Sequence, residues 1–127
     1  MQIPPSPIQP LLKKLLVRGL AAVDACTAVG RAISRNGEKL VIGRRRYDLR
    51  RYARVVVVGA GKATASMARA VEQRLGPRLQ GGFVVVKHGH VVPTRRIVVA
   101  EAGHPVPDRL GQRAAARLCA MVAELDR

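Results

Sequence analysis

Aromatic residues are nearly absent from this chain, which has two tyrosines, one phenylalanine and no tryptophan among 127 residues. Proteins that bind single-stranded nucleic acid stack the bases on exposed aromatic rings, so the shortage of rings weakens that interpretation. The core must instead be built from valine, leucine, isoleucine and alanine. Hydrophobic residues make up 48% of the sequence, which is enough to bury the core of one small domain.

Cysteine is also scarce, and the sequence has no signal-peptide pattern. Cys26 and Cys119 fit neither metal-binding nor redox-active spacings, and both stand among alanines, so we expect them to fill the core. No basic stretch precedes the apolar run near the start, and Lys13 and Lys14 interrupt that run. We therefore expect neither a signal peptide nor a membrane span, and a cytoplasmic location.

Acidic residues are few, 8 against 23 basic ones, which gives a net charge of +15. An arginine-rich, lysine-poor chain is also what a G+C-rich coding sequence produces, so the charge alone identifies no anionic partner. The densest cluster, "GRRRYDLRRYAR" over Gly43–Arg54, has two interpretations. It could bind nucleic acid or an acidic lipid surface, or it could form a solvated turn before the sheet, which we favour.

The first third of the chain is expected to be a leader, helices and a hairpin. Prolines at positions 4, 5, 7 and 10 indicate an extended leader over residues 1–10. Leucines and valines then recur at helical spacing over residues 11–34, which predicts one or two amphipathic helices. Two short strand-like runs around Gly43 suggest a small hairpin.

The rest alternates between strands and helices. Residues 55–58 are apolar on both faces, as in a central parallel strand, and residues 83–86 and 97–100 form the next two strands. A helix follows the first strand and ends near Gly76-Pro77, and a last helix follows Asp108 as N-cap. This order predicts an α/β fold with three layers and a mainly parallel, Rossmann-like sheet.

The direction of the third strand depends on a short connection of about eight residues. A tight hairpin would make this strand antiparallel, because parallel crossovers usually need a helix. Eight extended residues reach about 27 Å, which exceeds the roughly 17 Å of a five-residue strand, so a loose parallel return also fits. We favour the parallel return, which gathers three unusual loops at the carboxyl edge of the sheet, where ligands bind.

The first of these loops is Gly59-Ala60-Gly61-Lys62. It is not a Walker A loop, which needs four residues between its glycines and Ser or Thr after the Lys. It also fails the dinucleotide pattern, because Thr64 replaces the third glycine and no acid follows the second strand. Two glycines, a helix start and a lysine nevertheless suit an anion. The alternative is a glycine-rich turn with a solvated lysine.

The other two loops add cationic groups and one acid. We expect these groups to share a rim with the first loop, although ordinary loop histidines and a simple helix cap are the alternatives. No ligand spacing predicts a metal site. The residues concerned are Lys87, His88, Gly89, His90, His104 and Asp108.

Three blocks of the sequence resemble a known family. "RVVVVGAGKATASMARAVEQRL", "GGFVVVKHGH" and "RRIVVAEAGHPVPDRLGQRAA" are similar to the amino-terminal region of the glycerate 2-kinases of the MOFRL (DUF4147) group. The resemblance runs from about Leu11 to the end in the family's order. His88 replaces a usual tyrosine, and Asp24-Ala25 replaces a usual Asp-Pro.

The resemblance implies phosphorylation of D-glycerate at its 2-hydroxyl by ATP with Mg²⁺. Lys62 would then be catalytic, and Gly59, Ala60 and Gly61 would approach the ligand. Lys87, His88, Gly89, His90, His104 and Asp108 would line the same cleft, where glycerate's carboxylate accounts for the cationic rim.

Members of that family are several times longer. The resemblance therefore predicts that residues 11–127 are the amino-terminal part of an incomplete domain, inactive alone and completed by a carboxy-terminal chain or by self-association. A basic nucleic-acid-binding module and a non-functional remnant are the rival interpretations.

Overall fold

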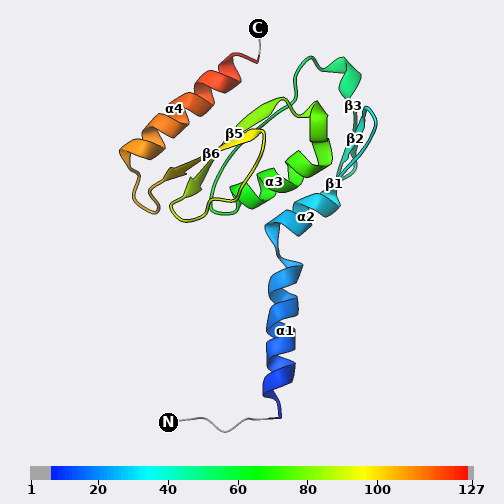
Figure 1. Cartoon of the computed structure of the whole chain (residues 1–127), viewed down its shortest axis with the longest axis vertical. Coiled ribbons are helices and arrows are strands. Elements are labelled where there is room, and N and C mark those ends of the chain that lie inside the picture. Colours follow the sequence, from blue (N-terminus) through cyan, green and yellow to red (C-terminus); the bar gives the residue numbers. More distant parts are fainter. Residues whose placement is uncertain (1–6, 126–127) are drawn as a thin grey trace.

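The computed structural model describes residues 7–125, which form two small sheets and the helices around them (Figure 1). Most of the predicted leader, residues 1–6, lies outside the described residues, and Gln9 and Pro10 already belong to the first helix. In chain order the elements are α1 (Gln9–Ala22), α2 (Ala25–Ala32), β1 (Ile33–Asn36), β2 (Lys39–Ile42), β3 (Arg45–Asp48), the 3-10 turn η1 (Leu49–Arg51), β4 (Val56–Ala60), α3 (Thr64–Leu75), the 3-10 turn η2 (Gly76–Arg78), β5 (Gly81–Lys87), β6 (Ile97–Ala102) and α4 (Arg109–Ala123).

The larger sheet confirms the predicted α/β class. Its strands are parallel in the order β4-β5-β6, with α3 on one face and α4 on the other, which gives three layers (Figure 1). The prediction that the valine strand is central was wrong: β5 lies in the middle and β4 at an edge. The α3 side of β4 is covered, whereas Val58 on its other side keeps 42% of its surface exposed.

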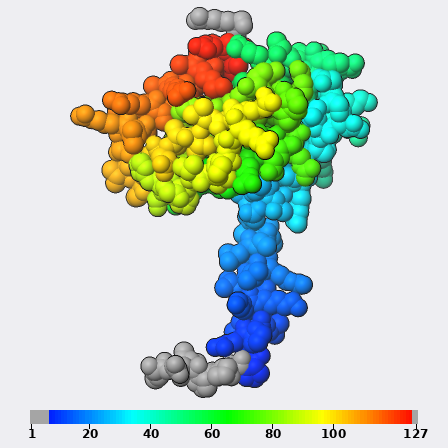
Figure 2. All heavy atoms as spheres, in the orientation of Figure 1, coloured from blue at the N-terminus to red at the C-terminus, as the bar shows by residue number. Residues whose placement is uncertain are grey.

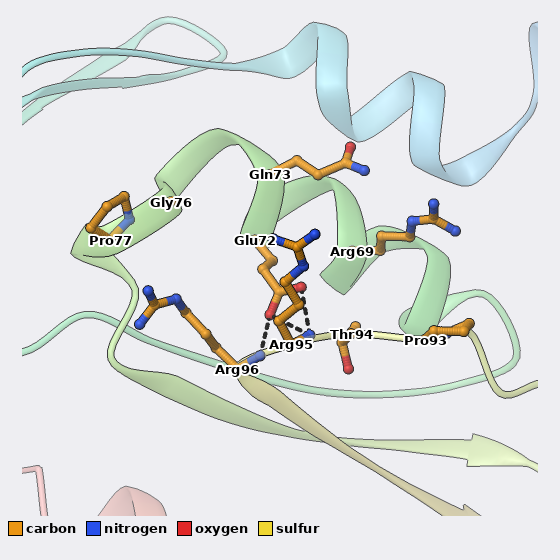
Figure 3. A pocket seen from close by; sticks show the side chains of 9 residues that line it. All are labelled: Arg69, Glu72, Gln73, Gly76, Pro77, Pro93, Thr94, Arg95 and Arg96. Carbon is orange, nitrogen blue, oxygen red and sulfur yellow. Dashed lines mark hydrogen bonds between the residues drawn. The ribbon is translucent and has the colours of Figure 1, made fainter.

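β6 returns parallel to β5 without a helix between them, as expected. The carboxylate of Glu72 on α3 accepts hydrogen bonds from the backbone N–H groups of Arg95, at 2.9 and 3.1 Å, and Arg96, at 2.5 Å (Figure 3). These are the last two residues before β6. A side chain of the crossing helix therefore fixes the point at which the third strand begins.

The smaller sheet is antiparallel, with the order β1-β2-β3. The hairpin predicted around Gly43 is confirmed as β2 and β3, and Gly43 has φ +59°, a conformation that favours glycine. The helix predicted to reach residue 34 was wrong, because α2 ends at Ala32 and Ile33–Asn36 pair with β2 as β1. The arginine cluster is not a simple turn either: it supplies β3 and η1.

One apolar core joins the two sheets. Val84, Leu75 and Ala68 from the larger sheet and its helix pack with Ile33 and Leu40 of the smaller sheet. Leu49 of η1 and Leu79, just before β5, belong to the same core. The expectation that both cysteines fill this core was wrong, because Cys119 is exposed and Cys26 only half-buried. Cys119 lies on the outer side of α4.

α1 projects from the rest of the molecule (Figures 1 and 2). None of its residues is buried, and its leucines are all more than half exposed. Asp24 accepts a hydrogen bond from the N–H of Thr27 and caps α2, where the chain changes direction. Within residues 7–125 no helix is long and apolar enough to cross a membrane.

Replacing Glu72 tests its part in the fold. Glu72→Ala removes the acceptor of three hydrogen bonds, and bonds to a charged group are worth about 1.5–3 kcal/mol. We expect the free energy of unfolding to fall by about 2 kcal/mol in urea titrations. Glu124→Ala, on an exposed residue at the end of α4, is the control and should change it by less than about 0.5 kcal/mol. Equal effects of the two substitutions would show that Glu72 does not anchor β6.

Candidate active site

Three loops meet at the carboxyl ends of β4, β5 and β6, as the parallel arrangement requires. Between them lies a small pocket of about 170 Å³. Each strand end contributes one part of the lining: Ala60, Gly61 and Lys62 after β4, Val85, Val86 and Lys87 on β5, and Ala102, Gly103 and His104 after β6. Lys62, Lys87 and His104, predicted from three separate segments, therefore share one pocket.

The glycine loop is held by its own backbone and by the neighbouring strand. Gly61 has φ +129°, donates its N–H to the carbonyl of Val85 at 2.9 Å, and accepts from the N–H of Thr64 at 3.1 Å. A side chain at Gly59 would come within 2.7 Å of the Thr64 methyl group. Thr64 thus fills the space that the missing third glycine of a dinucleotide site would leave open.

The start of α3 carries no acidic group. α3 begins at Thr64, its N-cap Ala63 provides no side-chain cap, and no acid lies in its first turn. Lys62 was expected in that first turn but lies in the turn just before the helix, where its side chain is exposed. Free helix N–H groups and a nearby ammonium group favour a bound anion.

Of the residues predicted on the second loop, one lines the pocket and three do not. Lys87 is half-buried and lines the pocket, whereas His88, Gly89 and His90 are exposed and are not among the lining residues. Gly89, at φ +78°, donates its N–H to the carboxylate of Glu101 at 2.7 Å. This bond turns the loop away from the pocket.

His88 instead contacts Asp108 from the third loop. Its Nε2 lies 3.1 Å from Oδ2 of Asp108, whose side chain is 35% exposed. Asp108 also caps α4, as predicted, by accepting the N–H of Gly111 at 2.7 Å. The backbone N–H groups of Gly111 and Gly103, followed by His88, lower the pKa of Asp108 to about 2.

The Asp108 carboxylate is therefore ionised at neutral pH and occupied as an acceptor. It holds the third loop and His88. Gly103 permits this arrangement, because a side chain there would lie 2.6 Å from the carbonyl of Val106 and 3.1 Å from the Asp108 carboxylate.

Neither a metal site nor a nicotinamide site is formed by these loops. Among residues 7–125 no group of three or more His, Cys, Asp or Glu is placed to hold a metal ion. The end of β5 offers Lys87 where a dinucleotide site needs an acid for the ribose. The pocket suits a compact anion.

The arginine cluster is divided between two sides of the small sheet, although Arg46 and Arg51 line one hollow with Arg35 and Lys39. Arg45 and Arg46 are neighbours on β3 and so point to opposite sides of the small sheet. Arg50 is paired with Asp48, with Nη2 and Oδ2 2.7 Å apart. This pairing lowers the pKa of Asp48 to about 2.

Fold and pocket together define a three-layer α/β protein with an anion-suited site at the carboxyl edge of a parallel sheet. The chain belongs to the DUF4147 family: the family model, described as a domain of unknown function, matches residues 11–127.

Two curated relatives carry different names. A putative hydroxypyruvate reductase of Agrobacterium vitis is 49% identical over 72 residues, which are 57% of this chain and 16% of the relative. A glycerate 2-kinase of Pyrococcus horikoshii is 34% identical over 95 residues, which are 75% of this chain and 21% of the relative. The chain therefore spans about a fifth of the length of these relatives.

Two crystal structures share the fold. A protein from Pyrococcus horikoshii OT3 aligns with a TM-score of 0.78 and 28% identity over 95% of this chain and 27% of that one. A glycerate kinase from Thermotoga maritima aligns with a TM-score of 0.68 and 27% identity over 93% of this chain and 25% of that one. The fold described above is thus one part of larger proteins of this kind.

Sequence reasoning overlooked two residues that shape the site. Glu101 fixes the loop after β5, and Thr64 packs against Gly59. Glu101 stands in a block quoted above, but its bond to Gly89 joins two strands and leaves no local pattern. Thr64 was noted only as the residue that breaks a glycine motif.

Adding a methyl group at Gly59 tests how tightly the loop is packed. Gly59→Ala should lower the free energy of unfolding by about 1–3 kcal/mol, because the new methyl group meets that of Thr64. Thr64→Ser removes the opposing methyl group and should restore most of the loss when the two changes are combined. Urea unfolding of all four proteins measures this coupling, and additive effects would refute the contact.

The lowered pKa of Asp108 predicts a pH effect on stability. Its pKa is about 2 in the folded chain against the usual 3.8, so the unfolded chain binds the proton first. This stabilisation is complete above pH 3.8 and is lost as the pH falls towards 2. Asp108→Asn should therefore make the fall in urea midpoint between pH 5 and pH 3 shallower than in wild type. Glu124→Gln controls for the loss of one carboxyl group; identical slopes in wild type and Asp108→Asn would contradict the assignment.

Proposed function

We propose that this chain forms one wall of the active site of a glycerate 2-kinase, which transfers the γ-phosphoryl group of ATP to the 2-hydroxyl of D-glycerate. One observation carries the proposal: the pocket at the carboxyl edge is lined by Lys62, Lys87 and His104, each from a different strand end. The carboxylate of glycerate and the phosphates of ATP are both anionic, so one cationic rim suits both.

Lys62 is the catalytic residue in this proposal. In the reaction the 2-hydroxyl oxygen bonds to the γ-phosphorus, the bond from that phosphorus to the bridging oxygen breaks, and its electron pair leaves on ADP as the hydroxyl proton is released. Negative charge is spread over the equatorial oxygens of the transferring group. The Lys62 ammonium group, exposed at the pocket, stabilises that charge.

The remaining residues bind and position. Gly59, Ala60 and Gly61 let the backbone approach the ligand, and Lys87 and His104 complete the rim. His88, Gly89 and His90 do not reach the pocket, and Asp108 holds the third loop through Gly111 and His88. These four therefore act on the shape of the site rather than on the reacting atoms.

Mg²⁺ is implied by kinase chemistry, but the residues described here do not fit it. Asp108, the carboxylate of the third loop, already accepts two backbone N–H groups and contacts His88. Among residues 7–125 no cluster of metal-ligating side chains is formed. We therefore assign no Mg²⁺ ligand to this chain and derive no step through the ion.

The loop geometry favours a kinase over the reductase named for the Agrobacterium relatives. A reductase would need a nicotinamide cofactor. Thr64 occupies the place of the third glycine, and Lys87 stands where the ribose-binding acid belongs. Neither Thr64 nor Lys87 hinders a phosphate-bearing substrate, and the positive charge of Lys87 attracts one.

A chimera tests the proposal. Residues 11–127 would replace the matching segment of the Pyrococcus relative, and ADP release would be followed with ATP, Mg²⁺ and D-glycerate. We expect turnover, and we expect Lys62→Ala to lower kcat by about 10²–10³-fold, the usual effect of removing one charge-stabilising group. Lys39→Ala, on β2 away from the pocket, is the matched control and should stay within about twofold.

Several outcomes would contradict the proposal. A folded chimera that oxidises NADH with hydroxypyruvate but releases no ADP would favour the reductase. An active chimera indifferent to Lys62→Ala would remove Lys62 from catalysis. Enzyme-like turnover by the 127-residue chain alone would refute its dependence on further segments.

The nucleic-acid hypothesis stays a rival prediction. It requires nucleic-acid binding that weakens steeply with rising salt concentration. Replacing Arg44, Arg45 and Arg46 should abolish that binding, and replacing Lys62 should leave it unchanged. The division of Arg45 and Arg46 between two sides of β3 disfavours it.

A further inference from the structure

A second hollow lies at the opposite edge of the larger sheet, where α3 ends and β6 begins (Figure 3). Its volume is about 690 Å³, within the range that holds a small molecule. It shares no residue with the candidate active site. Its lining comes from α3 and from the segment before β6: Arg69, Glu72, Gln73, Gly76, Pro77, Pro93, Thr94, Arg95 and Arg96.

The charge of this hollow is positive. Arg69, Arg95 and Arg96 are exposed, and Glu72 is the one acid among the lining residues, so three positive charges and one negative charge leave a net charge of +2. Within the described part of the chain, none of these arginines belongs to an ion pair. The three guanidinium groups are therefore available to a ligand.

Glu72 positions the segment that carries two of the arginines. Its carboxylate is occupied by the backbone N–H groups of Arg95 and Arg96, which fixes where both side chains leave the backbone. Arg69 lies on α3, one helical turn before Glu72. Figure 3 shows Arg95 between Arg69 and Arg96 along the hollow. Because the backbone at Arg95 and Arg96 is already fixed, ligand binding orders only the side chains.

The chemistry of the walls indicates the ligand. A guanidinium group matches the oxygens of a phosphate with two parallel hydrogen bonds. Pro77 and Pro93 make two walls stiff, and no aromatic ring lines the hollow on which a base could stack. We propose that this hollow binds a small phosphate-bearing molecule at a site separate from the candidate active site.

Binding of inorganic pyrophosphate to the full 127-residue chain tests this. Titration calorimetry in 150 mM salt should show saturable binding at this hollow, in addition to any binding at the candidate active site. Arg95→Ala/Arg96→Ala should weaken its affinity at least tenfold. This variant keeps both backbone N–H groups, so the bonds to Glu72 persist, and circular dichroism verifies that it is folded.

Two controls separate this site from other cationic surfaces. Arg109→Ala/Arg113→Ala removes the same charge from exposed positions on α4 and should leave the affinity within twofold. Lys62→Ala, in the candidate active site, should also leave the affinity of this hollow for pyrophosphate within twofold. The proposal is overturned if no saturable binding occurs, if both arginine pairs weaken binding equally, or if Lys62→Ala removes it while Arg95→Ala/Arg96→Ala does not.

A short oligonucleotide distinguishes the source of the phosphate. A ten-nucleotide single strand should bind no better than pyrophosphate through these arginines. If the strand displaces pyrophosphate at a lower concentration, and Arg95→Ala/Arg96→Ala removes that advantage, the site binds nucleic acid and the small-molecule proposal is wrong.

Discussion

The bonds between the Glu72 carboxylate and the backbone of Arg95 and Arg96 are the contact on which the site depends. The connection between β5 and β6 is too short for a helix, and a hairpin would have been the simpler solution. Glu72 anchors the chain beside the C-terminal end of α3. As a result the first residue of β6, Ile97, pairs with Gly82 near the start of β5. Three carboxyl ends then meet at one edge, and the three loops share a pocket.

Small residues allow the layers to approach closely enough for this arrangement. α3 packs against the sheet through buried alanines, including Ala65 and Ala68, so the helix axis lies near β5. Within the sheet, Gly82 on β5 lies opposite Val57 on the neighbouring strand β4, and any side chain there would collide with the Val57 carbonyl. The shortage of aromatic residues noted in the sequence therefore matches a thin core in which glycine and alanine set the spacing.

Patterns within one segment predicted most of this fold. The valine run, the helix that stops at Gly76 and the Asp108 cap were each visible in consecutive residues, and each is confirmed. The predictions that were wrong concerned features that depend on contacts with distant segments of the chain. The valine run could not reveal that α4 leaves β4 uncovered, and the four residues of β1 become a strand only because β2 pairs with them.

The candidate site was likewise predictable where it depends on local sequence, and not where it depends on contacts between distant segments. Parallel strands and loop composition sufficed to bring Lys62, Lys87 and His104 to one edge. They did not show that Glu101 on β6 would bind the second loop, or that His88 would contact Asp108, because these contacts join residues 12 and 20 positions apart in the sequence. The same limit hid the hollow beside Glu72, whose arginines come from α3 and from the chain before β6.

The most direct test of the proposed site uses an acyl-phosphate derivative of ATP, which transfers its acyl group to a lysine amine beside the bound phosphates. Residues 11–127 contain five lysines, at positions 13, 14, 39, 62 and 87, so mass spectrometry of the labelled chimera can assign every acylated site within this segment. The account predicts preferential labelling of Lys62 that free ATP prevents. Equal labelling of all five lysines, unchanged by ATP, would contradict a phosphate-binding role for the Gly59–Lys62 loop.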